Sequence, residues 1–269
     1  MEHLVIKYTA KPMSAFKAAQ QRSIVSYYLP SDFSSQSPAC IYIEEARNLL
    51  AARGTTGLRV WDASLHLAYF LSTEGASMVH GKTVLELGAG TGLLSILCAG
   101  ALKAAKVIAT DGDADVVDNI QSNADLNPAI LGKPPDKRKL EAKVLDWADI
   151  ESLPKLLKQE GKELSLDVIL GADITYAIES LEPLVTLLSA LNGEYPEVDI
   201  IISTVVRNAD TFSTFLEICA KAGFHISSIP FDCPSLGEQR GFFHKTTPPI
   251  RIVRLGQHAA VSLEDANNT

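Results

Sequence analysis

Three closely spaced glycines follow an apolar run and an acidic residue in the segment Glu86-Leu87-Gly88-Ala89-Gly90-Thr91-Gly92. A helical pattern starts directly afterwards, so backbone amides and a helix N-terminus would face a ligand bound at this turn. Asp111 ends the next apolar run, 19 residues after Gly92, where a carboxylate can accept hydrogen bonds from ribose hydroxyls. The pattern predicts a site for a nucleoside-containing cofactor, although a tight strand-to-helix turn would need glycines for steric reasons alone.

The spacing of these glycines favours S-adenosylmethionine over NAD or ATP. The pattern is Gly-x-Gly-x-Gly, and Leu93 stands where a dinucleotide-binding motif would have its third glycine. The motif has no Gly-Lys-Ser/Thr pair to bind a triphosphate. Glu86 would repel a pyrophosphate but would suit a cationic amino-acid group. We therefore expect Glu86, Gly88, Gly90 and Gly92 to lie at an S-adenosylmethionine site.

Polar side chains also follow the third and fourth predicted strands. Ligands of doubly wound sheets bind outside the carboxyl ends of the strands, so the residues at these ends should meet. Asp146, after the third strand, could accept a hydrogen bond from the adenine amino group. Trp147 would offer the base a flat apolar face, although a tryptophan buried in the core is the alternative interpretation.

The segment Gly171-Ala172-Asp173-Ile174-Thr175-Tyr176 follows the fourth strand and could position a methyl acceptor. A lysine amine must reach a sulfonium methyl group in its neutral form, and desolvation in a pocket would lower the lysine pKa. The Asp173 carboxylate would orient this amine, and Tyr176 would form the wall of its channel. The alternative is that Asp173 only caps the helix that begins near Ala177.

The elements that must position these residues alternate between strand and helix, which predicts a mostly parallel sheet. The expected strands are 83–88, 106–110, 141–145, 167–172, 198–204, 224–231 and 249–255, and the expected helices are 91–103, 113–126, 150–159, 178–192 and 208–222. Because no helix separates the last two strands, they should form an antiparallel pair. The predicted fold is α/β, a Rossmann-like sandwich of the class I methyltransferase type with a seven-stranded, mostly parallel sheet.

The N-terminal part should form an appendage to this domain. We expect an appendage at 1–57, a methyltransferase domain at 58–257 and a flexible tail at 258–269. Within the appendage, Leu4–Tyr8 could be a strand and Cys40–Ala52 is expected to be helical. A second amphipathic helix is predicted from Trp61 to Leu71.

Composition narrows the class of protein further. A net charge of −8 with no block of basic residues gives no electrostatic sign of a nucleic-acid partner. The four cysteines form no Cys-x-x-Cys pair and the six histidines are scattered, so no metal site or disulfide framework is expected. No signal peptide or membrane-length apolar run is present. We expect a cytoplasmic monomer that binds neither membranes nor nucleic acid directly.

Four segments together resemble the eukaryotic family-16 seven-β-strand protein methyltransferases: Trp61-Asp62-Ala63, Glu86–Gly92, Asp146-Trp147 and Asp173-Ile174-Thr175-Tyr176. The resemblance covers about residues 40–255. Most members methylate a lysine of a protein and carry an Asp-x-x-Tyr motif after the fourth strand. The finer match, through residues 55–63 and 171–176, is to the fungal enzymes of the branch that acts on translation elongation factor 2.

This resemblance implies an S-adenosylmethionine-dependent protein-lysine N-methyltransferase with elongation factor 2 as its protein substrate. Members of the branch often have a longer N-terminal region than the one preceding the matching part here. By resemblance, the residues expected around the cofactor are Trp61, Gly88, Ala89, Gly90 and Ala172.

Two other functions fit the same motifs. A methyltransferase of this fold could act on another protein, a small molecule or a nucleic acid, but Asp-Ile-Thr-Tyr stands where enzymes acting on nucleobase or glutamine nitrogen have Asn-Pro-Pro-Tyr. A non-catalytic scaffold would be expected to have lost polar groups at the strand ends, whereas Glu86, Asp111, Asp146 and Asp173 are all present.

Overall fold

The computed structural model describes residues 22–30, 39–46, 56–132, 139–159 and 162–256. The strands of the main sheet are β3 (Thr83–Leu87), β4 (Lys106–Asp111), β5 (Leu140–Val144), β8 (Val168–Ala172), β9 (Asp199–Val205), β10 (His225–Ile229) and β11 (Ile250–Gly256). The helices are α2 (Asp62–Thr73), α3 (Leu93–Ala99), α4 (Ala114–Asp125), α5 (Pro128–Leu131), α6 (Leu153–Leu156), α7 (Leu181–Glu194) and α8 (Ala209–Lys221). Short hairpins are formed by β1 (Ser23–Tyr28) with β2 (Cys40–Glu45) and by β6 (Lys158–Gln159) with β7 (Lys162–Glu163).

The main sheet has the order β10-β11-β9-β8-β3-β4-β5. Neighbouring strands from β9 to β5 run parallel, whereas β11 is antiparallel to both of its neighbours, β9 and β10. This confirms the predicted α/β fold and the antiparallel pair at its end. From β3 the chain adds strands outward to β4 and β5, and from β8 it adds β9 in the opposite direction. The carboxyl ends of β3 and β8 therefore flank the crevice in which ligands of such sheets bind.

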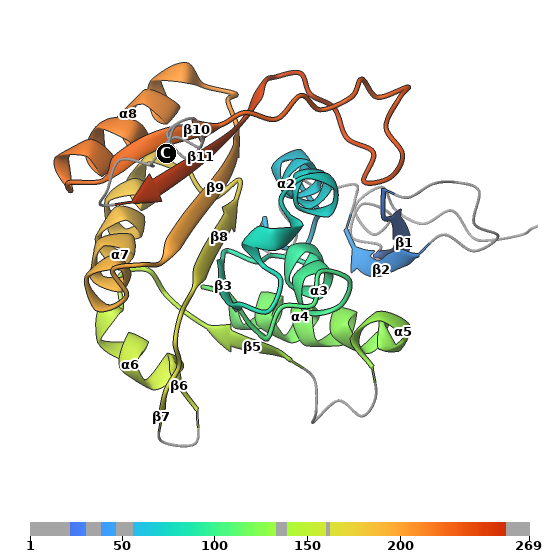
Figure 1. Ribbon diagram of the computed structural model, residues 1–269, viewed down its shortest axis with the longest axis horizontal. Helices are drawn as coiled ribbons and strands as arrows, with labels where there is room; N and C mark the ends of the chain where they lie inside the picture. Colours follow the sequence, from blue (N-terminus) through green and yellow to red (C-terminus); the bar gives the residue numbers. More distant parts are fainter. Residues whose placement is uncertain (1–21, 31–38, 47–55, 133–138, 160–161, 257–269) are drawn as a thin grey trace, which may run out of the picture.

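Helices cover both faces of the sheet, and the alternation of side chains along each strand explains why (Figure 1). Val84 packs with α2, α3 and α4 on one face, and the next residue, Leu85, packs with α6, α7 and α8 on the other. Because both faces are covered, the central strands are mostly apolar, and Glu86 of β3 is a buried exception. In the described part of the chain, no helix is long and apolar enough to cross a membrane.

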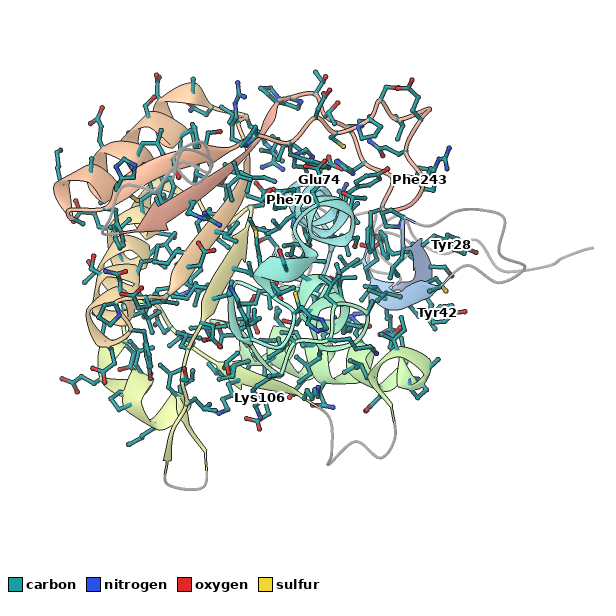
Figure 2. The ribbon with its side chains drawn as sticks, viewed as in Figure 1. Tyr28, Tyr42, Phe70, Glu74, Lys106 and Phe243 are labelled. Carbon is teal, nitrogen blue, oxygen red and sulfur yellow. The ribbon has the colours of Figure 1, made fainter. Side chains whose placement is uncertain are left out.

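The N-terminal appendage contradicts one prediction, because Cys40–Glu45 is a strand and not the start of a helix. Ile41 and Ile43 are buried while Tyr42 between them is exposed, which is the two-residue period of a strand. Tyr28 and Tyr42 project outward from the hairpin (Figure 2). The expected strand Leu4–Tyr8, residues 47–52 of the expected helix and the tail lie outside the described residues.

Two asparagines, Asn123 near the end of α4 and Asn127 just after it, attach this hairpin to the domain. Asn127 pairs with Tyr42 through both amide groups: its Oδ1 accepts from the Tyr42 backbone N–H at 2.8 Å, and its Nδ2 donates to the Tyr42 carbonyl at 2.7 Å. Asn123 Oδ1 accepts from the Glu44 N–H at 2.8 Å, and Asn123 Nδ2 donates to the Thr91 carbonyl at 2.9 Å. Both side chains are buried, so these amides replace a neighbouring strand for β2.

We expect Asn127→Ala to lower the free energy of unfolding by about 1–3 kcal/mol, because the Tyr42 backbone groups lose their partners. Urea denaturation followed by circular dichroism measures this change. Gln121→Ala removes an exposed amide from the adjoining helix α4 and is the matched control. Equal unfolding midpoints for the two variants would contradict the assigned role of Asn127.

Candidate functional site

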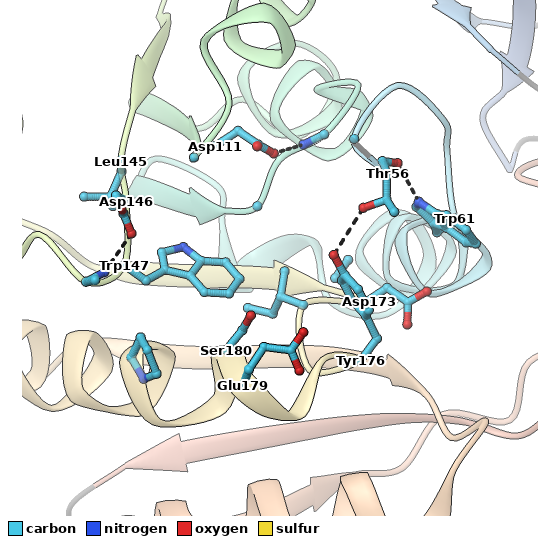
Figure 3. Close-up of a pocket in the computed structure, with 18 residues that line it drawn as sticks. Thr56, Trp61, Asp111, Leu145, Asp146, Trp147, Asp173, Tyr176, Glu179 and Ser180 are labelled. Atoms are coloured by element: carbon cyan, nitrogen blue, oxygen red, sulfur yellow. Dashed lines mark hydrogen bonds between the residues drawn. The ribbon is translucent and has the colours of Figure 1, made fainter. Parts of the chain in front are cut away.

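A cavity of about 340 Å³ opens at the carboxyl ends of β3, β4, β5 and β8 (Figure 3). The structure brings nine of the twelve predicted site residues together in its wall: Trp61, Gly88, Gly90, Asp111, Asp146, Trp147, Ala172, Asp173 and Tyr176. The other three, Glu86, Ala89 and Gly92, do not line it. The cavity therefore lies where the order of the sheet reverses, as the topology requires.

The glycine turn forms one side of the cavity. Gly88 and Gly90 both have positive φ, 62° and 54°. A Cβ atom at Gly88 would lie 2.7 Å from Ile174 Cγ2, and one at Gly90 would lie 3.2 Å from the Gly57 carbonyl. Side chains are excluded at both positions, because the turn packs closely against Ile174 and Gly57.

Ala89 and Gly92 hold the turn in place from behind. The Ala89 N–H donates to the Thr110 carbonyl at 2.8 Å, which ties the turn to β4. Gly92 is the left-handed N-cap of α3, and a Cβ there would lie 2.8 Å from Ile120 Cγ2 of α4. This third glycine thus permits close packing of the turn on a helix.

Glu86 is buried beneath the turn and accepts a short hydrogen bond from the Ser95 hydroxyl. Burial raises the pKa of its carboxyl to about 8, against the opposing effect of Ser95. Glu86 is therefore largely protonated at neutral pH, and the structure places it between β3 and α3 and not in the cavity wall.

This raised pKa has a consequence for stability. A carboxyl with an unfolded pKa of about 4.5 and a folded pKa of about 8 keeps its proton only in the folded state between these pH values. Its contribution to stability is therefore complete below pH 4.5 and is lost as the pH rises through 8. At pH 9 we expect the free energy of unfolding of Glu86→Gln to exceed that of the wild type by roughly 1–3 kcal/mol, and this difference should shrink towards pH 5. Urea denaturation at both pH values measures it. A difference that does not change with pH would contradict this ionisation.

Asp111 faces the cavity from the end of β4 and is held there by backbone amides. Its Oδ2 accepts from the Gly90 N–H at 3.1 Å, and its Oδ1 accepts from the Asp113 N–H at 3.2 Å. Burial raises the pKa of Asp111 above its ordinary value, although these amide donors act in the opposite direction. The glycine turn and Asp111 thus fix each other's positions across the two strand ends.

Asp146 and Trp147 form the next part of the wall, after β5. Asp146 Oδ1 accepts from the Ala148 N–H at 2.9 Å, which fixes the carboxylate at the rim. The Trp147 ring lies against Gly88, where an added Cβ would be 3.5 Å from the ring carbon Cζ2. Trp147 Nε1 is buried and has no hydrogen-bond partner among the described residues. The tryptophan offers an apolar face and an unsatisfied donor together, and it also packs on the core formed with α7.

Asp173 lies at the end of β8, and Arg207 forms a bidentate ion pair with it. Arg207 Nη1 donates to Oδ1 at 3.0 Å and Nη2 donates to Oδ2 at 2.7 Å. Asp173 is 7% exposed and has a φ of 59°, which is uncommon for a residue other than glycine. Ala177 and not Asp173 precedes the following helical turn, and no side chain caps it, so the alternative role of Asp173 as a helix cap is wrong.

Arg207 extends this arrangement to Trp61. Its guanidinium carbon lies 5.3 Å from the centre of the Trp61 ring, and that of Arg59 lies 5.1 Å from it. Cation–π contacts of this kind orient both partners. Arg207 was not among the predicted site residues, although its position directly before the N-cap of α8 placed it at a strand end.

Thr56 joins the two aromatic residues at the mouth of the cavity. Its carbonyl accepts from Trp61 Nε1 at 3.1 Å, and its hydroxyl lies 3.2 Å from the Tyr176 hydroxyl (Figure 3). Tyr176 remains 59% exposed, so it forms an edge of the opening. Thr56 is not among the predicted site residues either, although it lies in the segment 55–63 that carries the finer family resemblance.

These residues fit S-adenosylmethionine. Gly88 and Gly90 line the cavity with backbone alone, where the amino-acid end of the cofactor could lie, and Asp111 presents oxygens that can accept from ribose hydroxyls. Asp146 and Trp147 combine an acceptor with an apolar face, as an adenine ring requires. Asp173 and Tyr176 line the cavity on the side of β8.

Comparison with known proteins agrees with this site. The model of a family described as lysine methyltransferase matches residues 41–222. The protein-lysine N-methyltransferase EFM3 of Chaetomium thermophilum is 39% identical over 91% of this chain and 71% of its own length. The protein-lysine N-methyltransferase EEF2KMT of Mus musculus is 29% identical over 76% of this chain and 59% of its own length.

Solved structures share the fold. The crystal structure of SMU.776, assigned as a methyltransferase and complexed with SAH, matches with a TM-score of 0.51. The match covers 80% of this chain and 53% of that one at 15% sequence identity, so it bears on the fold alone.

Proposed function

Because this chain belongs to the lysine methyltransferase family and S-adenosylmethionine is its methyl donor, we propose that it methylates a lysine of translation elongation factor 2. The observation that carries the proposal is the buried Asp173 carboxylate at the acceptor end of the cavity, held by Arg207. The relatives named EFM3 and EEF2KMT support this choice of substrate.

The cofactor site divides into three contacts in this proposal. Gly88 and Gly90 bind the amino-acid end, Asp111 binds the ribose, and Asp146 with Trp147 binds the base. S-adenosylmethionine, when bound, supplies a methyl group on a sulfonium that is already activated for transfer to a neutral amine. The contribution of the protein is therefore to position the acceptor and to exclude water.

Asp173 positions the lysine amine. A carboxylate has about four acceptor sites. Arg207 donates two hydrogen bonds and the Val205 N–H a third, at 3.4 Å to Oδ1, so a site on Oδ2 is left for an N–H of the substrate. With one N–H held by Asp173, the nitrogen lone pair is free to point into the cavity. The positive charge of Arg207 offsets the negative charge of Asp173, so the pair orients the amine without strongly favouring its protonated form.

The opening of the cavity has features suited to a protein substrate. Tyr176 and Ile178 are both exposed, and they follow the acceptor-end residue Asp173 along the chain. A lysine side chain that passes Tyr176 would keep its methylene groups against an aromatic surface while its amine reaches Asp173. This arrangement favours a lysine in an exposed segment of the partner.

The direct test is methylation of purified elongation factor 2 with labelled S-adenosylmethionine, followed by mass spectrometry of the labelled peptide. We expect label on one lysine with the wild type and none with Asp173→Ala. Label on other proteins of a whole lysate but not on elongation factor 2 would discard the proposed substrate and keep the enzyme class. Label on an arginine or an N-terminal amine would discard the lysine assignment.

A further inference from the structure

A buried cluster of two histidines and a cysteine lies outside the cavity. His66 of α2 and His244 of the segment between β10 and β11 are both buried, and their Nδ1 and Nε2 atoms are 3.0 Å apart. Cys233 Sγ lies 3.6 Å from the same His244 Nε2. The three ligand atoms are all within 4.8 Å of one another, so they converge on one point.

Two of the three spacings between these atoms are close to the edges of a tetrahedral zinc site, and the third, between His66 and Cys233, is within 4.8 Å. With Zn–N of about 2.05 Å and Zn–S of about 2.3 Å, a tetrahedron has edges of about 3.3 Å between two nitrogens and about 3.6 Å between nitrogen and sulfur. The observed distances are 3.0 Å and 3.6 Å. Little movement would be needed to place one ion among the three atoms.

Hydrogen bonds among the three side chains explain the cluster less well than a bound cation does. His244 Nδ1 lies 2.7 Å from the Phe242 carbonyl, which can only accept, so Nδ1 carries the proton and Nε2 has a single lone pair. Both His66 Nδ1 and Cys233 Sγ approach this one lone pair. A cation bound between them would use a lone pair from each of the three atoms.

The surroundings of His244 are those of a metal-binding histidine. Such histidines usually donate their other ring N–H to a carbonyl or carboxylate, and His244 does so to Phe242. The buried Gln239 side chain accepts from the backbone N–H of His244 at 2.9 Å through Oε1, and its amide nitrogen lies 3.8 Å from Cys233 Sγ. These contacts hold the loop that carries two of the three ligand atoms.

The charge states also suit a cation. Burial lowers the pKa of His66 to about 4, with a further contribution from His244, and burial lowers the pKa of His244 as well. Both rings are therefore neutral at pH 7, as metal ligands must be. Burial raises the pKa of the Cys233 thiol to about 11 and the charge of Asp232 adds to this effect, so an ion must displace the thiol proton. Asp62 and Asp232 supply negative charge close to the cluster.

We propose that His66, Cys233 and His244 form a binding site for one zinc ion. Binding would form two Zn–N bonds and one Zn–S bond and would release one proton, that of the Cys233 thiol. Three protein ligands leave a fourth position to water. No local sequence pattern marks such a site, because His66 and His244 are 178 residues apart and the cysteine is not part of a Cys-x-x-Cys pair.

The ion would fasten the segment 230–249 to α2. This segment passes over α2 towards the β1–β2 hairpin (Figure 1), and the Phe242 N–H donates to the Tyr28 carbonyl at 2.9 Å. α2 starts directly after Trp61, a residue of the cavity wall. The site would therefore secure the helix that begins at the active-site opening.

The test is titration of the full chain with Co²⁺, in metal-free buffer with a phosphine reductant. We expect one ion per chain, the visible bands of a tetrahedral complex and a sulfur-to-cobalt charge-transfer band in the near ultraviolet. Zinc should displace the cobalt and raise the melting temperature by several degrees. Calorimetry in buffers of different ionisation enthalpy should show release of one proton per ion.

Variants separate this site from adventitious binding. Cys233→Ser should lose the charge-transfer band and at least about tenfold in affinity, whereas Cys40→Ser, at a half-buried free cysteine, should match the wild type. Wild-type protein that leaves cobalt with the spectrum of the aqueous ion would overturn the proposal, and this result does not depend on the folding of any variant. A charge-transfer band that persists in Cys233→Ser would overturn the ligand set.

Discussion

Asp173→Ala is expected to lower the rate of methyl transfer by a factor of about 10²–10⁴ while changing the affinity for S-adenosylhomocysteine by less than about twofold. The reason is the location of this carboxylate at the end of β8, which β3 separates from Asp111 at the end of β4. Without it, the amine loses the group that orients its lone pair. Arg207 is 41% exposed, so water can solvate its charge when the partner is removed. Single-turnover kinetics and calorimetric titration measure the two quantities separately.

Asp199→Ala is the matched control for this variant. Asp199 pairs with Arg254 through two short contacts, at 2.9 Å and 3.0 Å, and it does not line the cavity. It therefore reports the effect of breaking an aspartate–arginine pair on the same sheet without touching the site. A comparable loss of transfer in both variants would mean that Asp173 acts only through the stability of the fold.

Asp111→Ala should have the complementary effect and weaken binding of the cofactor by a factor of about 100. Hydrogen bonds to a charged group contribute about 1.5–3 kcal/mol each, and the loss of two such bonds to ribose hydroxyls corresponds to this factor or more. The Gly90 and Asp113 amides also lose their acceptor, which loosens the turn. Titration with S-adenosylhomocysteine measures the affinity, and the transfer rate at saturating cofactor should stay close to that of the wild type.

The exposed residue Asp118 provides the control on α4, because Asp118→Ala removes the same charge without affecting the cavity. Its affinity for the cofactor should equal that of the wild type. If Asp111→Ala and Asp173→Ala lose cofactor affinity equally, the division of the cavity into a cofactor end and an acceptor end is refuted.

The main sheet could be predicted from the sequence because its strands carry strong local patterns. β3 and β8 are apolar runs that end at glycines or acids, and each is followed by a helical period. Since parallel strands place their carboxyl ends at one edge, the position of Asp111 near Gly88 and Gly90 follows from topology alone.

Contacts between distant residues could not be predicted in this way. The ion pair of Asp173 with Arg207 depends on β8 and β9 lying side by side, with Ala172 opposite Ser203. The sequence predicts a helix from Cys40 because the local composition suits both a helix and a strand. The partners that make Cys40–Glu45 a strand, β1 and the two asparagines, lie elsewhere in the sequence. Tertiary pairing decided the structure of this segment.

The spacing of the two asparagines that hold β2 also determines the register in which this strand docks. A helix advances about 6 Å over four residues, and a strand advances about 6.6 Å over two. The four-residue spacing of Asn123 and Asn127 on the helix side therefore nearly equals the two-residue spacing of Glu44 and Tyr42 on the strand. Each asparagine can reach its own partner on β2. A shift of β2 by one residue would misalign both amides by half this repeat and would turn Ile41 and Ile43 towards solvent. The hairpin can thus dock beside α4 in one register only. This register sets the position of Glu45, whose carboxylate accepts a hydrogen bond from the N–H of Val60, the residue before Trp61.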